Sequence, residues 1–262
     1  MKKTTRHLFA NYSKTSVEYK AAKKTLISFT IFITLAIVAV FSWRWLWNQP
    51  FDNGIQGGIQ KPFRSILNLN EKVFGNLESA GHLAKTYPVS EAAKRVRVNG
   101  NIGLGNNFDA TKWKLQVVKS SGDTAYFTIE DLKRLPKTEI IFNFKCIEGW
   151  NQITWWGGVR FADFIKFYHL ENESSMKYVG MTTPGNEYYV GIDMPSALHP
   201  QTLLCYEMNR QPLPMNQGFP LRLIIPVKYG IKSIKRIGTI FFSNEKPPDY
   251  WFERGYDYYA GL

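Results

Sequence analysis

The chain has 262 residues and a mass of 30.2 kDa, which is enough for one domain of ordinary size or two small ones. Apolar residues make up 44% and charged residues 21%, a composition that excludes a disordered chain. Two cysteines, and four histidines that lack a zinc-ligand spacing, exclude a disulfide scaffold and a Cys-rich or His-rich zinc site.

Positive charge is concentrated at the start of the chain. Residues 1–24 contain seven Lys and Arg residues and one acidic residue, so they carry half of the net charge of +12. The remaining excess is spread thinly over the rest of the chain, whereas a nucleic-acid-binding domain gathers its cations on one face. We therefore expect no nucleic-acid partner.

Residues 25–47 are predicted to form a transmembrane helix. The 19 residues from Thr25 to Trp43 carry no charge, and a helix of this length spans roughly 30 Å, the thickness of the hydrocarbon core of a bilayer. Trp43, Trp45 and Trp47 follow as interfacial aromatics do. The alternative is a cleaved signal peptide, but the apolar run is longer than usual and no small-residue cleavage site follows it. The prediction is a single helix in membrane lipid.

Charge also predicts the orientation of this helix. Because cationic residues favour the cytoplasmic side, the basic tail of residues 1–24 is expected in the cytoplasm and the main domain on the periplasmic or extracytoplasmic side.

The rest of the chain is divided into two parts. Residues 48–95 are a linker and a helical segment, in which the apolar spacing predicts a helix from Pro62 to about Leu77. Residues 96–262 are predicted to be one α+β domain dominated by strands. The strands are expected at 113–118, 139–144, 176–181, 188–192, 221–227 and 238–243, with short helices at 128–135 and 159–168 and a helix-like apolar stretch at 201–209.

A few residues could carry chemistry. Cys146 follows an apolar strand and precedes a turn, so its sulfur could face a pocket; the alternative is an inert buried thiol, which we expect for Cys205. Between 209 and 240, Arg and Lys residues around turns could hold a phosphate, or could be solvated residues of a hairpin. The Asn- and Gly-rich segment 97–107 permits close approach of the backbone to a ligand.

Together these segments resemble the molybdopterin-binding domain of the sulfite oxidase family. The matching motifs, in chain order, are RVNGNIGL (97–104), FKCIEGW (144–150), LLCYEMN (203–209), PLPMNQGFPLRLIIPVKYGIKSIK (212–235) and DYWFERGYDYYAGL (249–262). In style they are closest to the bacterial protein-methionine-sulfoxide reductase catalytic subunits.

The resemblance implies a molybdenum ion held by a pyranopterin (molybdopterin) and by the thiolate of Cys146, which would be the metal ligand and catalytic centre. The positions that match cofactor contacts are Asn99, Ile102, Gly103, Thr182, Gln217, Arg222, Lys232, Ser233, Ile234 and Lys235. Thr183 is an alternative to its neighbour Thr182.

The resemblance also implies a function. Cys146 is followed by Ile-Glu-Gly-Trp, without the arginine expected to help bind sulfite, which favours a membrane-anchored molybdenum oxidoreductase that reduces an S-oxide or N-oxide, small or protein-bound, by two-electron oxygen-atom transfer. The alternatives are a sulfite-oxidising dehydrogenase and a non-catalytic, membrane-tethered binding protein on the same fold.

Because no haem motif is present, a separate membrane partner, such as a b-type cytochrome or a quinone-linked protein, is expected to exchange the electrons. Proteins normally receive this cofactor in the cytoplasm and are then exported in the folded state by a twin-arginine signal. This chain has Lys23-Lys24 before its apolar run and no Arg-Arg pair. Either a Lys-Lys variant of the signal is accepted, or the catalytic domain faces the cytoplasm.

Overall fold

The computed structural model describes residues 16–52, 58–74, 82–105 and 108–262. The chain forms two compact units: one contains residues up to 50 and residues 60–62, and the other contains residues 51–59 and 63–262. Of the predicted basic tail, residues 1–15 lie outside the described residues, and helix α2 already begins at Val17.

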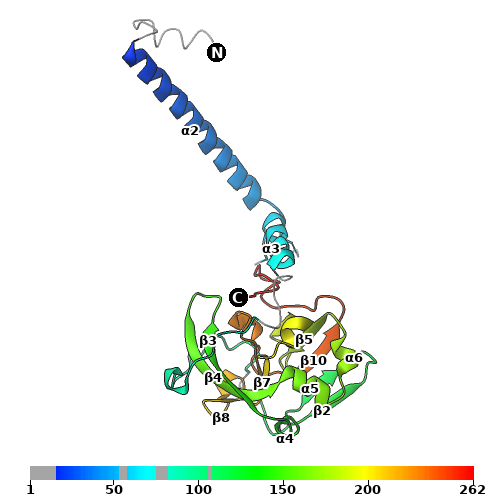
Figure 1. The fold of residues 1–262 in the computed structure, drawn as a ribbon. Helices are drawn as coiled ribbons and strands as arrows, with labels where there is room; N and C mark the ends of the chain where they lie inside the picture. Colours follow the sequence, from blue (N-terminus) through cyan, green and yellow to red (C-terminus); the bar gives the residue numbers. More distant parts are fainter. Residues whose placement is uncertain (1–15, 53–57, 75–81, 106–107) are drawn as a thin grey trace. The chain divides into compact units, whose positions relative to one another are not determined.

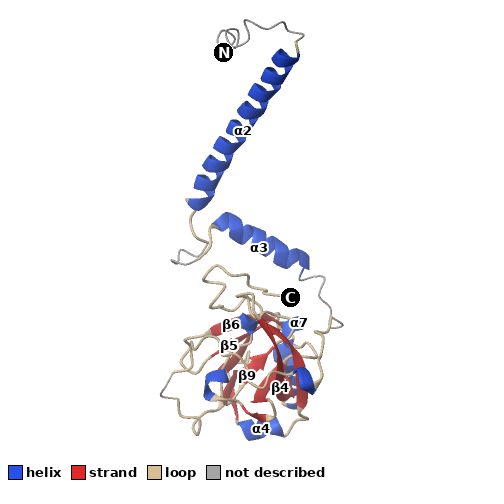
Figure 2. Cartoon of the chain, turned by 90° about the vertical axis from the view of Figure 1, so that its left-hand side faces the viewer, coloured by secondary structure: helices blue, strands red, loops and turns tan. Residues whose placement is uncertain are grey.

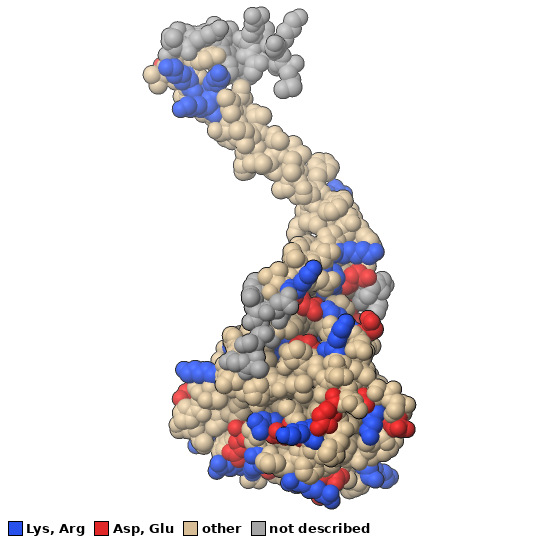
Figure 3. Space-filling view, turned by 45° about the vertical axis from the view of Figure 1, so that its right-hand side comes forward, with Lys and Arg blue, Asp and Glu red and all other residues tan. Residues whose placement is uncertain are grey.

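The first unit consists mainly of α2 (Val17–Trp47), a helix of 31 residues with no buried side chain. Ser16 caps it by accepting a hydrogen bond from the backbone N–H of Tyr19 at 3.2 Å. The hydroxyls of Thr30 and Thr34 each donate to a carbonyl four residues earlier, so neither is left unsatisfied in an apolar medium. Figure 3 shows uncharged side chains along α2 with cations at its N-terminal end.

Within the described residues, α2 is the one helix long and apolar enough to cross a membrane. Its length and composition suit a membrane anchor or an N-terminal signal sequence.

Helix α3 (Lys61–Phe74) follows and has Pro62 at its second position, where the missing N–H costs no hydrogen bond. The predicted helix is confirmed as far as Phe74; residues 75–77 lie outside the described part of the chain.

Two five-stranded sheets form the second unit (Figure 1; Figure 2). The strands of the first sheet, in the order β2-β1-β10-β5-β6, are β2 (Thr124–Phe127), β1 (Leu115–Val118), β10 (Thr239–Ser243), β5 (Tyr178–Thr182) and β6 (Tyr189–Asp193). Neighbours are antiparallel except β1 and β10, which are parallel. The β1–β10 pairing brings residues 116–118 beside residues 239–241 and so closes the domain across most of its sequence.

The second sheet contains the β3–β4 hairpin, whose turn includes Cys146. Its strands are β3 (Thr138–Lys145), β4 (Asn151–Arg160), β7 (Leu203–Met208), β8 (Gln211–Pro212) and β9 (Arg222–Ile224), in the order β3-β4-β7-β8 with β9 also paired to β7. Strands β3 and β4 pair antiparallel from Thr138 opposite Gly158 to Lys145 opposite Asn151. Residues 146–150 form the turn between them, which places Cys146 at the end of β3.

Short helices and turns connect the strands. They are η1 (Val89–Glu91), α4 (Ile129–Lys133), α5 (Phe161–Phe167), α6 (Glu171–Ser174), α7 (Met194–Ala197), η2 (Met215–Gln217) and η3 (Gly230–Lys232). Thr128 and Asp131 form a reciprocal capping box at the start of α4, as expected for the predicted helix at 128–135.

The core has two parts, one on each face of the second sheet. Leu204 and Tyr206 of β7 lie in the larger cluster, together with residues of the first sheet and α5, whereas Leu203 and Cys205 lie in a smaller cluster with Trp156 of β4. Strand β7 is therefore buried on both faces, and its sequence lacks the alternation of a half-buried strand.

The strand-dominated α+β fold is confirmed, with local differences. The expectation of a helix-like stretch around Cys205 is wrong: residues 203–208 are strand β7, and a run that is apolar on both faces cannot be told from a buried helix by periodicity. The predicted helix at 159–168 starts later, because residues 159 and 160 still belong to β4. The predicted strand at 221–227 is regular only over Arg222–Ile224.

A substitution at Gly158 would test how closely β4 packs against β7. A Cβ at this position would lie 2.2 Å from the Leu204 carbonyl oxygen and 2.7 Å from the Cys205 Cα, both backbone atoms that cannot move aside. Gly158→Ala should lower the free energy of unfolding by about 1–3 kcal/mol, in the range of overpacked cores. Chemical denaturation measures this, with Gly185→Ala as the control, because its Cβ would make only ordinary contacts at 3.7 Å or more. Equal stability of the two variants would contradict this packing.

Candidate functional site

A pocket in the second unit gathers most of the predicted site residues. It encloses about 960 Å³ of space not filled by atoms, a figure that includes space open to solvent. Seven of the predicted residues line it: Asn99, Ile102, Cys146, Gln217, Arg222, Ser233 and Lys235. They come from four separate segments of the chain, so the pocket exists only in the folded domain.

Cys146 lies at the closed end of the β3–β4 hairpin. Its backbone N–H donates to the Trp150 carbonyl at 2.9 Å, and its carbonyl accepts from the Gly149 N–H at 3.0 Å, which holds the turn tightly. Gly149 has a φ of 89°, a conformation that favours glycine at this position. The side-chain amide of Asn99 approaches the Cys146 sulfur at 3.6 Å. Cys146 is 7% exposed and lines the pocket, so its sulfur is available to a ligand bound there.

The second cysteine, Cys205, lies away from the pocket on β7. It is fully buried, and its thiol donates to the Glu207 carbonyl at 3.1 Å. Burial raises the pKa of this thiol to about 12. Cys205 is therefore a protonated packing residue at neutral pH.

Arg222 is a buried cation at the pocket wall, at the start of β9. Its Nη1 donates to the backbone and side-chain carbonyl oxygens of Gln217 at 3.1 and 2.9 Å, and its Nη2 donates to the Ser233 carbonyl at 3.2 Å. The guanidinium also lies 4.6 Å from the ring centroid of Trp156. Burial lowers the pKa of Arg222 to about 10.

Lys235 brings a second positive charge to the same wall. Its Nζ donates to the carbonyls of Asn99 and Gly100 at 2.7 and 2.8 Å, which ties the 97–105 segment to the pocket. Burial, with a smaller contribution from the nearby charge of Arg222, lowers the pKa of Lys235 to about 7. In the part of the chain that the structure describes, neither Lys235 nor Arg222 forms an ion pair with a carboxylate.

Two polar atoms at this wall have no hydrogen-bond partner among the residues that the structure describes. They are the buried Nε of Arg222 and the buried hydroxyl of Ser233. A buried donor and two cations without counter-charges are costly unless a ligand satisfies them. The site therefore fits a ligand with an anionic group, such as the phosphate of a pyranopterin, and a soft metal ion that a thiolate can bind.

Four predicted cofactor contacts do not line the pocket. The Gly103 N–H donates to Glu187 at 3.2 Å, and a Cβ on Gly103 would lie 2.5 Å from the methyl group of Thr183. The hydroxyl of Thr182 is buried in β5 and has no hydrogen-bond partner in the described part of the chain, and Ile234 packs in the larger core cluster. Gly103 and Ile234 each adjoin a residue that does line the pocket.

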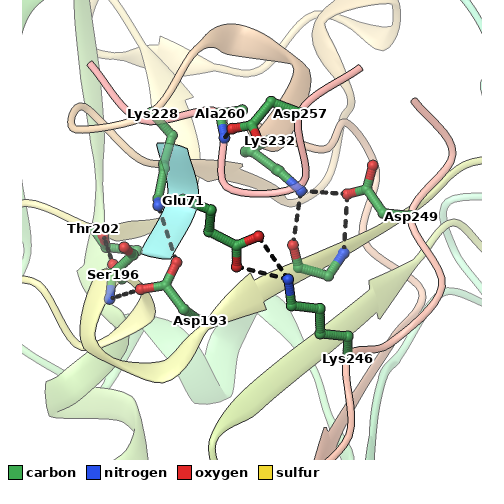
Figure 4. Close-up of polar contacts among 11 residues, drawn as sticks. Glu71, Asp193, Ser196, Thr202, Lys228, Lys232, Lys246, Asp249, Asp257 and Ala260 are labelled. Atoms are coloured by element: carbon green, nitrogen blue, oxygen red, sulfur yellow. Dashed lines mark hydrogen bonds and ion pairs between the residues drawn. The ribbon is translucent and has the colours of Figure 1, made fainter. Parts of the chain in front are cut away.

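Lys232, the fourth, is part of a buried ion pair (Figure 4). Its Nζ lies 2.5 Å from Asp249 and donates to the Gly191 carbonyl at 2.9 Å, while the Gly191 N–H donates to Asp249 at 3.2 Å. Lys232 thus fastens the chain after residue 247 to β6 and positions η3. Its charge is compensated by Asp249, whereas Arg222 and Lys235 have no carboxylate partner among the described residues.

Aromatic residues that sequence reasoning missed complete the pocket. Trp150, Trp251 and Tyr256 line it, and the guanidinium of Arg97 lies 4.6 Å from the ring centroid of Trp150. The high aromatic content of the sequence was the available signal for such residues. These aromatic residues are far apart in the sequence, so their meeting in one pocket could not be predicted from it. Tyr188 also lines the pocket; it donates to the Ile231 carbonyl at 2.6 Å, and burial raises its pKa, so it remains a neutral phenol.

Comparison with known proteins shows the family to which this chain belongs. Residues 102–251 match the family described as oxidoreductase molybdopterin binding domain. YedZ1 of Azospira oryzae, whose name makes it a candidate subunit of a protein-methionine-sulfoxide reductase, is 33% identical over 205 residues, which are 78% of this chain and 77% of that protein. The protein-methionine-sulfoxide reductase catalytic subunit MsrP of Campylobacter jejuni is 30% identical over 217 residues, 76% of this chain and 71% of that protein.

Among solved structures, the sulfane dehydrogenase SoxCD of Paracoccus pantotrophus matches with 16% identity and a TM-score of 0.47, over 53% of this chain and 40% of that one. The family match spans more than half of the chain, and the relatives cover more than two thirds of it. This chain belongs to the family of oxidoreductases with a molybdopterin-binding domain, that of the sulfite oxidases, and is an enzyme whose cofactor is molybdopterin.

Proposed function

We propose that this chain is the catalytic subunit of a membrane-anchored, molybdenum-dependent reductase that removes the oxygen atom of a sulfoxide, with protein-bound methionine sulfoxide as its substrate. The observation that carries the proposal is the buried guanidinium of Arg222, which lacks a carboxylate partner in the described chain and shares a pocket with Cys146. The names of the two similar proteins, both of which concern protein-methionine-sulfoxide reductases, support the substrate.

The pocket residues divide into two groups by chemistry. The Cys146 thiolate would hold the molybdenum, because a soft sulfur ligand suits this metal. Arg222, Lys235 and the Ser233 hydroxyl would hold the anionic end of the pterin, and Gln217 would orient Arg222. When bound, the cofactor supplies two-electron oxygen-atom transfer.

The reaction consumes two electrons and two protons and releases water: the S=O bond of the sulfoxide is broken, and the product is a thioether. Around the site, Trp150, Trp251 and Tyr256 form an aromatic wall of the pocket. Thioether groups pack favourably against aromatic rings, so this wall suits a methionine side chain. Tyr188, as a neutral phenol bonded to the Ile231 carbonyl, holds η3 in place beside the cations.

The membrane anchor is the uncharged part of α2, with the basic residues 1–24 in the cytoplasm and the catalytic domain on the periplasmic side. The charge asymmetry across the apolar run supports this topology. Because relatives are named as subunits, we propose that a separate membrane protein, such as a b-type cytochrome or a quinone-linked protein, supplies the electrons. An anchor confines both partners to one membrane.

Cys146 and Cys205 form a matched pair of test positions. Cys146→Ser should lower reduction of methionine sulfoxide with an artificial electron donor by at least about 10², because the thiolate ligand is lost. Cys205→Ala should retain molybdenum and activity, since Cys205 lies outside the pocket. Elemental analysis for molybdenum and kinetics on the purified full chain measure both effects.

Two results would contradict the proposal. A Cys146→Ser variant with wild-type activity would reject Cys146 as the ligand. A robust rate of sulfite-dependent reduction of an acceptor, without sulfoxide reduction, would instead establish a sulfite dehydrogenase.

The lowered pKa of Lys235 predicts that the free energy of unfolding of the apoprotein depends on pH. In the folded state Lys235 loses its proton near pH 7, whereas in the unfolded chain it keeps the proton up to about 10.5. The unfolded state therefore binds more protons between these values, and the free energy of unfolding should rise with pH in this window, by at most about 1.4 kcal/mol per unit. An anion bound beside Lys235 would keep it protonated and flatten the rise.

Denaturation of cofactor-free protein between pH 7 and pH 10 measures this slope. Lys235→Met should remove it, and Lys112→Met, at an exposed lysine, should not. Identical slopes in wild type and Lys235→Met would show that Lys235 stays charged in the folded apoprotein.

A further inference from the structure

Three exposed cations lie where the chain enters the pocket. Lys94, Arg95 and Arg97 are exposed, and Arg97 lines the pocket together with Val96. None of the three forms an ion pair with a carboxylate in the part of the chain that the structure describes. We call these three residues the basic rim. Three cations within four residues produce a positive potential at the edge of the cavity that holds Cys146.

The backbone of the basic rim is fixed to the second sheet. The side chain of Gln152, on β4, accepts from the Arg97 N–H at 2.9 Å and donates to the Arg95 carbonyl at 3.1 Å. The side-chain amide of Asn209, directly after β7, donates to the Lys94 carbonyl at 3.3 Å. The backbone that carries the three charges is therefore positioned before a ligand arrives, so that little chain has to be ordered on binding.

Arg97 is placed to bind a carboxylate beside the pocket. Its guanidinium lies 4.6 Å from the ring centroid of Trp150, and its carbonyl accepts from the side-chain amide of Gln217 at 3.2 Å. A guanidinium over an aromatic ring keeps the N–H donors at its edge available, and their planar fork matches a carboxylate. Glu148 also lines the pocket, but it accepts from the Trp150 indole N–H at 3.2 Å, and no ion pair joins it to Arg97 in the described chain.

We propose that the basic rim binds acidic residues that flank methionine sulfoxide in a protein substrate. This inference rests on the proposed function and deepens it, because it assigns a sequence preference to the substrate. When a methionine sulfoxide side chain enters the pocket, the neighbouring residues of its chain stay at the edge. Successive residues of an extended peptide are about 3.3 Å apart, so residues up to three positions away lie within about 10 Å of the entry point. Cations without carboxylate partners attract acidic side chains there and repel basic ones.

The small size of the basic rim favours a peptide over a nucleic acid. Proteins that bind nucleic acids without sequence preference neutralise many phosphates along a strand, and their affinity rises with that number. The basic rim has three cations and adjoins a pocket that is lined by the aromatic rings of Trp150, Trp251 and Tyr256. A short acidic peptide with one methionine sulfoxide provides both an anion for the cations and a sulfur side chain for the rings.

Matched peptides measure the preference, with the full chain loaded with its cofactor and an artificial electron donor. One peptide carries a single methionine sulfoxide between Glu residues, and the other has Gln in their place, which removes the charge and keeps the shape. At low salt the Glu peptide should have a kcat/KM about three- to tenfold higher, mainly through KM, because exposed ion pairs contribute modestly. The difference should shrink at 1 M salt, where charges are screened beyond about 3 Å. Equal values at low salt would overturn the proposal.

Charge reversal gives a readout that a merely structural role would not change. Arg95→Glu combined with Arg97→Glu should invert the preference, so that a peptide with Lys beside the methionine sulfoxide becomes the better substrate. Lys112→Glu combined with Lys166→Glu is the matched control, because both lysines are exposed and lie outside the pocket lining. The control should keep the preference for Glu. A rim variant that retains molybdenum and still prefers the Glu peptide would overturn the proposal.

A milder variant covers the case in which charge reversal prevents folding. Lys94→Gln combined with Arg95→Gln removes two charges of the basic rim, and neither residue lines the pocket. The ratio of kcat/KM between the Glu and Gln peptides should fall in this variant. An unchanged ratio would also overturn the proposal.

Equilibrium binding separates this inference from the proposed function. Fluorescence anisotropy of the labelled peptides, without an electron donor, should show tighter binding of the Glu peptide than of the Gln peptide. Tighter binding without sulfoxide reduction would reject the function and keep the role of the basic rim. Reduction of both peptides without a difference in binding would keep the function and reject that role. Displacement of the Glu peptide by single-stranded DNA at the same concentration of charge would also overturn the proposal, because the rim would then bind any polyanion.

Discussion

The wall of the pocket is organised around the buried guanidinium of Arg222. Its Nη atoms are satisfied by Gln217 and Ser233, which draws η2 and the residues after η3 toward β9. Its charge has no carboxylate partner in the described chain, and its Nε has no acceptor. Desolvation disfavours such a cation. An anionic ligand in the pocket would compensate its charge.

The contrast with the neighbouring cations is informative. Lys232 is as deeply buried as Arg222, but it is paired with Asp249 and belongs to the scaffold. Lys228 likewise has an ion pair with Asp193 at 3.0 Å (Figure 4). Buried cations of this domain therefore differ in how they are held: carboxylates pair with Lys232 and Lys228, whereas carbonyl oxygens hold the guanidinium of Arg222.

The C-terminal segment contacts the buried Lys232, the pocket and helix α3. It receives the ion pair of Lys232 through Asp249, it contributes Trp251 and Tyr256 to the pocket, and it is held by Arg64 of α3. The pocket, its aromatic wall and helix α3 are therefore connected over a short stretch of chain.

The sequence by itself determined the local features: the uncharged span of α2, the Pro at the start of α3, the capping box at Thr128, and the strand–turn that ends at Cys146. These depend on residues within one turn or one hairpin of each other, so periodicity and turn chemistry suffice to predict them. The resemblance in motifs added the cofactor and seven of the residues that line the pocket. Sequence alone misread β7, because burial on both faces erases the alternation that identifies a strand. Only the tertiary structure decided that Lys232 has a carboxylate partner while Lys235 has none in the described chain, and that Trp251, Tyr256 and Arg97 share a pocket with Cys146. Those outcomes depend on which distant segments meet, and the charge or apolarity of a residue does not reveal its partner until the chain has folded.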